Sequence, residues 1–154
     1  MKNRNIQHKD DWGTPDYILE KVRKILQTGT YFDPCPLEHT CIDWDGLEID
    51  WHYKNYCNPP YSRKLKEAFI KKAVKEQNKG NTTLMLLPVS TSTKIFHEYV
   101  LPNAEITFIK GRIKFKGFNT KGEYVTNKCG MHDSMFVLFR GKQLKWGEKW
   151  YQQD

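Results

Sequence analysis

The tetrapeptide Asn58-Pro59-Pro60-Tyr61 is the segment of this chain whose residue types most clearly suggest chemistry. It follows a run at 55–57 that is typical of a β-strand, and the two prolines prevent that strand from continuing. Neither proline has an N–H group, so the segment presents carbonyl oxygens without competing donors. The Asn58 side-chain oxygen and the Pro59 carbonyl can therefore both accept hydrogen bonds from one planar amino group. Tyr61 can stack on the ring that carries this amino group.

These acceptors suit the alkylation of an exocyclic amine such as that of adenine. The nitrogen is a poor nucleophile because its lone pair is delocalised into the ring. Two acceptors that hold both hydrogens favour the pyramidal geometry needed for attack on a methyl sulfonium, most strongly in the transition state. An aromatic side chain also suits a base flipped out of a duplex. A purely structural Pro-Pro turn is the alternative, but the tyrosine and the flanking strand and helix favour a site.

Strands that alternate with helices are predicted around this segment, which indicates an α/β fold. The first helix has Thr14 as its cap, Pro15 at its first position and Gly29 just past its end. Two further helices are predicted at 62–80 and 92–101. The predicted strands are 30–33, 55–57, 82–87 and 134–140, with a hairpin formed by 105–109 and 112–116 around a Lys110-Gly111 turn. In such sheets, ligands bind beyond the carboxyl ends of the strands.

The composition fits one compact domain of 154 residues with a polyanionic partner. Aromatic residues make up 14% of the chain, and the formal net charge is +7. No apolar run approaches the roughly 18 residues of a membrane span, and no signal segment is evident, so we expect a cytoplasmic protein without membrane contact. The four cysteines are irregularly spaced without a C-x-x-C pair, so no metal site is predicted.

Several blocks in a fixed order give the chain its resemblance to a known family. They are Trp12-Gly13-Thr14-Pro15, Asp33-Pro34-Cys35, Asp45-Gly46-Leu47, Cys57-Asn58-Pro59-Pro60-Tyr61, Met85-Leu86-Leu87-Pro88, Phe96-His97-Glu98-Tyr99-Val100 and Gly111-Arg112. Each block is weak alone, but in this order they resemble the phage-type DNA N6-adenine methyltransferase (Dam) family. The resemblance implies a shortened Rossmann-like methyltransferase sheet with a β-hairpin near its C-terminal edge. It also implies S-adenosylmethionine as cofactor and methylation of a flipped-out adenine in double-stranded DNA. In a phage setting, such methylation can protect DNA from restriction and would occur in the cytoplasm of the host cell.

The resemblance also implies roles for individual residues. Asn58, Pro59, Pro60 and Tyr61 would form the catalytic loop. Cofactor contacts would come from Asn58 and from three further blocks, namely Trp12, Thr14 and Pro15; Asp33, Pro34 and Cys35; and Asp45 and Gly46. In these blocks Asp33 resembles the carboxylate that meets the cofactor's amino group, and Asp45 resembles the acid that bonds the adenine amino group of S-adenosylmethionine. Each acid is also compatible with a simple turn.

Two departures from the family pattern concern the cofactor site. The first strand lacks the glycine-rich turn of larger methyltransferases, because Cys35-Pro36-Leu37 follows it. Asp33 and Asn58 are also too close in sequence for a full β-α-β-α-β passage, so the second strand and its ribose-binding acid are expected to be shortened or missing. Glu38 or Asp43 is a candidate substitute.

Basic and aromatic residues alternate in the segment 110–133, which we expect to be a DNA-contacting insertion. Its predicted phosphate contacts are Lys110, Arg112, Lys114, Lys116, Lys121 and Lys128. A solvated hairpin edge is the alternative for this segment. The tail at 141–154 is polar and aromatic, with no chemistry assigned, and the oligomeric state is left open between a monomer and a weak dimer.

Two other functions stay open at this point. Asn-Pro-Pro-Tyr loops also serve methyltransferases that act on glutamine amides or RNA, and the basic segment argues only against a protein substrate. A nucleic-acid-binding protein that keeps the fold with little or no catalysis is the third possibility, because the glycine-rich turn is missing.

Overall fold

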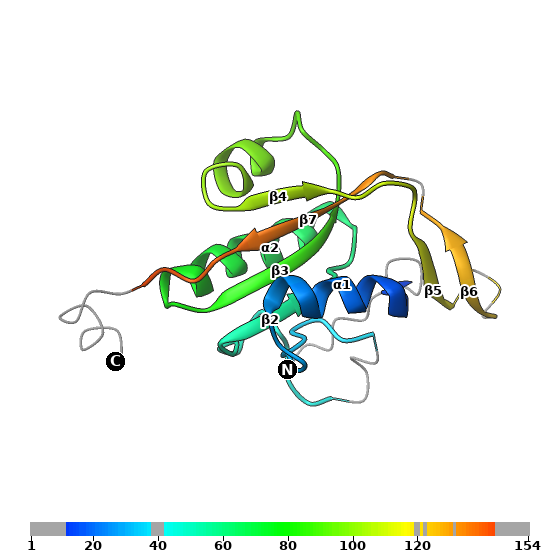
Figure 1. The fold of residues 1–154 in the computed structure, drawn as a ribbon, viewed down its shortest axis with the longest axis horizontal. Helices are drawn as coiled ribbons and strands as arrows, with labels where there is room; N and C mark the ends of the chain where they lie inside the picture. Colours follow the sequence, from blue (N-terminus) through cyan, green and yellow to red (C-terminus); the bar gives the residue numbers. More distant parts are fainter. Residues whose placement is uncertain (1–11, 38–41, 119–120, 122, 131, 144–154) are drawn as a thin grey trace.

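The computed structural model describes residues 12–37, 42–118, 121, 123–130 and 132–143, and shows a mixed α/β fold with two β-sheets (Figure 1). The described helices are α1 (Asp16–Leu26), α2 (Arg63–Asn78) and the short π-helix η2 (Phe96–Val100). The described strands are β1 (Trp12–Gly13), β2 (Lys54–Cys57), β3 (Thr82–Pro88), β4 (Glu105–Phe108), β5 (Lys114–Phe118), β6 (Tyr124–Cys129) and β7 (Ser134–Phe139).

The larger sheet has the strand order β2-β3-β7-β4. β2 and β3 are parallel, whereas β7 runs antiparallel to both β3 and β4, so the sheet is mixed. The strands predicted at 55–57, 82–87 and 134–140 are confirmed as β2, β3 and β7. The strand predicted at 30–33 is reduced to a single bridge, in which Phe32 pairs in parallel with Asn55.

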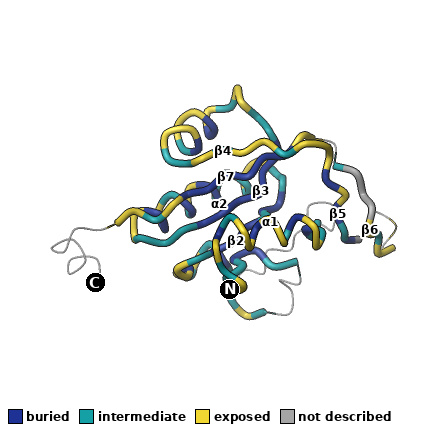
Figure 2. Tube along the Cα trace, viewed as in Figure 1, coloured by how far each residue is buried: buried dark blue, intermediate teal, exposed yellow. Residues whose placement is uncertain are grey.

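Alternating side chains of the central strands form a hydrophobic core on each face of this sheet. Leu84 and Leu86 pack with α1, whereas Met85 and Leu87 pack with α2 and η2. Figure 1 shows α1 in front of the sheet and α2 behind it, and Figure 2 shows β3 and β7 buried between them. This alternation with period two explains why a continuously apolar strand is covered on both sides.

The first helix begins one residue later than predicted and is capped differently. Pro15 is its N-cap, and Thr14 makes no capping hydrogen bond to the helix. At the other end Gln27 adopts the left-handed conformation with φ 55°, and its N–H bonds the Lys24 carbonyl, so Gln27 rather than Gly29 ends the helix. The helix predicted at 62–80 is confirmed as α2. Ser62 is its N-cap residue, and Gly80, with φ 94°, follows its end.

The predicted hairpin of 105–109 with 112–116 is wrong. β4 pairs with β7, while β5 forms an antiparallel hairpin with β6 and belongs to a second sheet of order β1-β5-β6. Lys110-Gly111 redirects the chain out of the larger sheet, with Gly111 at φ 80°. The physical reason is burial, because Ile113 and Phe115 enter the α1-side core whereas β4 remains on the apolar strand β7.

The directions of the strands place the predicted functional segments at one edge of the sheet. The ends of the parallel strands β2 and β3 lead into Asn58 and into the loop at 89–94. β4 is antiparallel to β7, as β3 is, so its end points the same way and leads to the β5–β6 hairpin. Figure 1 shows this hairpin projecting beyond the ends of these strands. Among the described residues, no helix has the length and apolar character needed to cross a bilayer.

Candidate active site

Asn58 leaves the end of β2 with a defined side-chain orientation. Its amide nitrogen donates a hydrogen bond of 2.7 Å to the backbone carbonyl of Trp12, and the side chain is partly buried. Because the nitrogen is used in this way, the amide oxygen is the atom left to accept from a substrate. Trp12 lies in β1, which pairs with β5, so the hairpin sheet helps to hold the side chain on which the predicted chemistry depends.

Asn58 lines a small cavity of about 180 Å³ at this edge of the sheet. Among the other residues predicted from sequence to contact the cofactor, Trp12, Thr14, Asp33 and Cys35 also line this cavity, whereas Pro15 does not. The remaining lining residues are Gly13, Leu19, Tyr31, Leu37, Tyr56 and Lys116. The cavity therefore brings together residues that are as far apart in sequence as Trp12 and Lys116, and their spacing in the sequence does not predict this.

Tyr56 and Tyr31 are site residues that the sequence reasoning missed. The Tyr56 hydroxyl lies 2.6 Å from Thr14 Oγ1, and both side chains are buried. The rings of Tyr31 and Tyr56 meet edge to face with centroids 5.7 Å apart. Burial raises the pKa of Tyr56 well above its ordinary value, although the hydrogen bond with Thr14 acts in the opposite direction. Tyr56 is therefore a neutral phenol in the cavity wall. The sequence feature that could have identified it is its place in the predicted strand, two residues before Asn58.

Thr14→Val is expected to destabilise the fold, because it leaves the buried Tyr56 hydroxyl without its partner at nearly constant side-chain volume. A buried polar group that loses its hydrogen bond costs about 1–3 kcal/mol. Urea unfolding of the wild type and the variant would measure the difference in unfolding free energy. In a double-mutant cycle, Thr14→Val with Tyr56→Phe should cost less than the sum of the two single changes. A fully additive cycle would contradict the assignment of this pair.

Two predicted cofactor segments, at 33–35 and at 45–47, pack directly against each other. In each turn the aspartate accepts a hydrogen bond of 2.9 Å from a backbone N–H two residues later, Asp33 from Cys35 and Asp45 from Leu47. A Cβ atom on Gly46 would lie 1.8 Å from the Pro34 carbonyl oxygen, so only glycine fits this contact. The two turns therefore form one unit beside the cavity, although Pro34, Asp45 and Gly46 do not line it.

Trp51 and Glu76 hold this unit from behind. Trp51 Nε1 donates a 2.7 Å hydrogen bond to the Gly46 carbonyl, and the Trp51 backbone N–H donates to Glu76 at 3.2 Å. Glu76 is fully buried, yet it also accepts from Asn81 and pairs with Lys72 and Lys79. Burial by itself would raise the pKa of Glu76, but these hydrogen bonds and the charge of Lys79 hold the pKa below its ordinary value. The carboxylate is thus a charged anchor for the loop that carries Trp51.

The other residues of the tetrapeptide are the two prolines, which are more buried than Asn58, and Tyr61, which is partly buried. Pro59 and Pro60 are buried, and the Tyr61 ring packs edge to face on Phe115 with centroids 6.2 Å apart. The Tyr61 hydroxyl is buried without a hydrogen-bond partner among the described residues, and burial raises its pKa. Tyr61 does not line the cavity, so the stacking of a base on its ring stays a prediction.

The basic residues predicted to grip DNA do not share one environment. Lys110, Arg112, Lys114 and Lys121 are exposed, and Arg112 lies 3.8 Å from Asp133. Lys116 is only 32% exposed and belongs to the cavity wall. Lys128 is part of β6, but its side chain lies outside the described residues.

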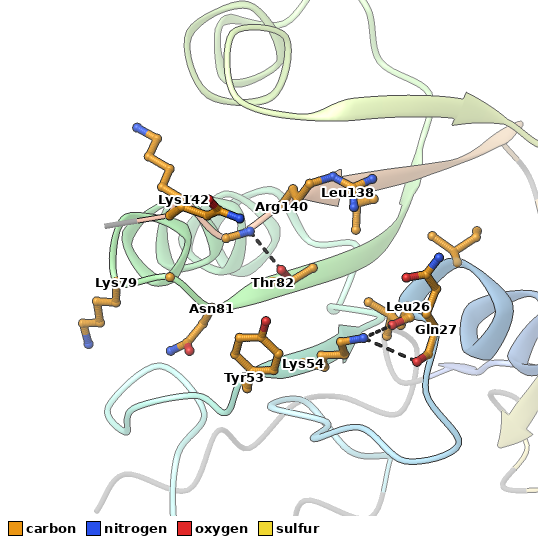
Figure 3. A pocket seen from close by; sticks show the side chains of 14 residues that line it. Leu26, Gln27, Tyr53, Lys54, Lys79, Asn81, Thr82, Leu138, Arg140 and Lys142 are labelled. Carbon is orange, nitrogen blue, oxygen red and sulfur yellow. Dashed lines mark hydrogen bonds between the residues drawn. The ribbon is translucent and has the colours of Figure 1, made fainter. Parts of the chain in front are cut away.

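A larger cavity, of about 860 Å³, lies at the opposite edge of the sheet and contains none of the predicted site residues (Figure 3). Several basic side chains border it, but they bind neighbouring groups of the chain. Lys54 donates to the Leu26 and Gln27 carbonyls at the end of α1, as Figure 3 shows, and Arg140 pairs with Glu105 at 2.8 Å. We therefore place the candidate site at the Asn58 cavity in spite of its smaller volume.

Comparisons with known proteins identify the family to which this chain belongs. The model of the family described as DNA N-6-adenine-methyltransferase (Dam) matches residues 2–146. A DNA N-6-adenine-methyltransferase of Escherichia phage T1 is 41% identical over 165 aligned residues, which cover 91% of this chain and 66% of that relative. The chain thus spans just under two thirds of the length of this relative. No solved structure matches significantly. The extent of the family match shows that this chain belongs to the DNA N-6-adenine-methyltransferase (Dam) family.

Proposed function

We propose that the chain transfers a methyl group from S-adenosylmethionine to the N6 amine of a flipped-out adenine in DNA. The observation that carries this proposal is the orientation of Asn58. Its amide nitrogen is held by Trp12, which leaves its oxygen to accept beside a cavity that also contains Asp33. The name of the phage T1 relative describes methylation of adenine N6 in DNA.

In this mechanism Asn58 and the Pro59 carbonyl accept hydrogen bonds from the two hydrogens of the adenine amine. S-Adenosylmethionine, when bound, supplies an electrophilic methyl group on a sulfonium sulfur. The acceptors favour a pyramidal nitrogen whose lone pair would form the new N–C bond while the methyl–sulfur bond breaks. The electrons of that bond would leave with sulfur as S-adenosylhomocysteine, and the nitrogen would lose its extra proton to solvent. Because the acceptors act most strongly on the developing positive charge, they raise the rate more than they raise the affinity for substrate.

The cavity residues fit one end of the cofactor. The cavity is smaller than the roughly 300–1,000 Å³ of sites for drug-sized ligands, so we place only the methionine part in it. Trp12 and Tyr31 supply aromatic rings that suit a sulfonium cation, and Asp33 supplies a carboxylate for the ammonium group. The Asp45-Gly46 turn would receive the adenine part. Thr14 and Cys35 would complete the cavity wall, and Pro15 and Pro34, their neighbours in sequence, would fix the backbone beside it, as in a shortened Rossmann-like methyltransferase.

We propose that the chain is a single methyltransferase domain and that DNA binds over the same edge of its sheet. The segment 110–133 projects there, and its exposed cations suit phosphate groups. Lys110, Arg112, Lys114, Lys121 and Lys128 are the proposed contacts. The loop at 89–94 leaves the adjacent end of β3 and is a candidate for contacts to bases.

Incorporation of radiolabelled methyl groups from S-adenosylmethionine tests this function. Unmethylated duplex DNA, RNA and protein are offered in parallel, and label is expected in DNA as N6-methyladenine. Fully N6-methylated DNA of the same sequence is the control and should accept no label. Label found only in RNA would show that RNA, and not DNA, is the substrate. DNA binding without any label would instead indicate a nucleic-acid-binding protein that lacks catalysis.

A further inference from the structure

Lys116 stands apart from the other basic residues of the segment 110–133. The exposed fraction of its side chain is 32%, and the side chain lines the Asn58 cavity. Among the described residues that line this cavity, Lys116 is the basic one and Asp33 is the acidic one. Its position therefore differs from that expected of a phosphate contact on an exposed hairpin.

The pairing of β1 with β5 directs Lys116 across the cavity wall. Gly13 and Lys116 are directly opposed in this antiparallel pair, so their side-chain positions lie on the same face. A Cβ atom on Gly13 would lie 3.1 Å from Lys116 Cγ and 3.2 Å from Leu37 Cδ2. The stem of Lys116 thus occupies the space above Gly13, beside Leu37. The absence of a side chain at Gly13 allows the lysine to take this path.

The visible partner of Lys116 does not explain its position. Lys116 Nζ lies 3.4 Å from Asp16 Oδ1, but the Asp16 side chain is 91% exposed. Ion pairs of this exposed kind contribute little to stability, because solvent screens the charges. The ammonium group can therefore exchange this contact for a better anion in the cavity.

We propose that Lys116 binds the carboxylate of the cofactor's methionine part, opposite Asp33, which binds its ammonium group. This proposal rests on the proposed function, because it assigns one residue within the same cofactor site. An α-amino acid end carries one negative and one positive group, and the cavity provides one side chain of each opposite charge. Lys116 is thus a cofactor-binding residue rather than a DNA contact.

The test compares Lys116→Gln with Lys114→Gln, a matched control on the same strand whose side chain is exposed. Calorimetry measures binding of S-adenosylhomocysteine, which has the amino acid end, and of 5′-methylthioadenosine, which lacks it. Lys116→Gln should weaken S-adenosylhomocysteine binding by about tenfold or more, in line with the loss of a charge-assisted hydrogen bond, and leave 5′-methylthioadenosine binding unchanged. Lys114→Gln should change neither. Lys116→Arg, which keeps the charge, should retain most of the affinity.

Binding of duplex DNA at several salt concentrations separates this role from a phosphate contact. Lys114→Gln should reduce the slope of log K against log salt by about 1, whereas Lys116→Gln should leave it unchanged. Three outcomes would overturn the assignment: wild-type affinity of Lys116→Gln for S-adenosylhomocysteine, equal loss of affinity for both small ligands, or a reduced salt slope with unchanged cofactor binding. If the wild-type protein bound neither small ligand, the proposed function would be overturned as well. Failure of the Lys116 assignment alone is therefore distinguishable from failure of the proposed function.

Discussion

Asn58→Ala is expected to lower the rate constant for methyl transfer by about 10²–10³-fold, the range measured when one preorganised polar contact to a transition state is removed. The variant keeps the backbone carbonyl of Pro59, so one acceptor for the adenine amine remains. It loses both the amide oxygen and the hydrogen bond from the amide nitrogen to Trp12. Affinity for S-adenosylmethionine should fall far less than the rate, because Asn58 is one of several residues that line the cofactor cavity, whereas its amide oxygen is one of only two acceptors for the amine.

Single-turnover methylation of duplex DNA, at saturating cofactor, measures this rate constant without a contribution from product release. Asn103→Ala is the matched control, because the Asn103 amide also donates to a backbone carbonyl, that of Tyr99 at 2.9 Å, away from the cavity. The control should leave the rate constant unchanged. A folded Asn58→Ala protein with wild-type activity would overturn the proposed mechanism.

Asn58→Asp separates the two functions of this side chain. An aspartate retains an oxygen acceptor for the amine but cannot donate to the Trp12 carbonyl, and two acceptors facing each other repel. The Asn58→Asp variant should therefore be more active than the alanine variant and less active than the wild type. This order would show that both the acceptor and its orientation contribute.

The strands β2, β3 and β7 and the turn that the paired prolines impose were predictable because their signals are local. Paired prolines end a strand wherever they occur, and apolar runs such as 82–87 form buried strands in most contexts. The order of the family blocks also brought Trp12, Thr14, Asp33, Cys35 and Asn58 together as candidates, and the structure places these five around one cavity.

The pairing of β5 and the partner of Thr14 were not predictable, because both depend on contacts distant in sequence. Local alternation favours a hairpin with 105–109, but burial of Ile113 and Phe115 against α1 draws the strand to the second sheet. Thr14 is a good capping residue, yet a buried tyrosine 42 positions away competes for its hydroxyl. Tertiary contacts outweigh local propensity in both cases.

The role of Gly46 shows the same limit. An Asp-Gly pair predicts a turn from its own conformational preferences. It does not predict that the backbone of Pro34, twelve residues earlier, lies where a side chain would begin, with the Pro34 carbonyl oxygen 1.8 Å from the Cβ position. Glycine is needed here for close approach between two backbones and not for an unusual φ.

Gly46→Ala is therefore expected to separate the turn at 45–47 from the turn at 33–35. The Cβ atom would also lie 2.8 Å from the Pro34 carbonyl carbon, so it is backbone that must move rather than a flexible side chain. Overpacking of this kind costs about 1–3 kcal/mol of unfolding free energy. Because Asp33 and Asp45 sit on the two turns that move, affinity for S-adenosylmethionine should fall by at least about tenfold, which corresponds to about 1.4 kcal/mol.

Gly29→Ala is the matched control, since Gly29 is exposed and its Cβ position has no atom within 4 Å. It should be neutral or stabilise the fold by up to about 1 kcal/mol, with no change in cofactor affinity. Trp51→Phe gives an independent disturbance of the same turn, because it removes the donor to the Gly46 carbonyl while it retains an aromatic ring beside Phe69. Thermal unfolding and calorimetry with S-adenosylmethionine, both on the folded proteins, give the two readouts. If Gly46→Ala lowered stability but left cofactor affinity at the wild-type value, the paired turns would be structural and the cofactor's adenine part would have to bind elsewhere.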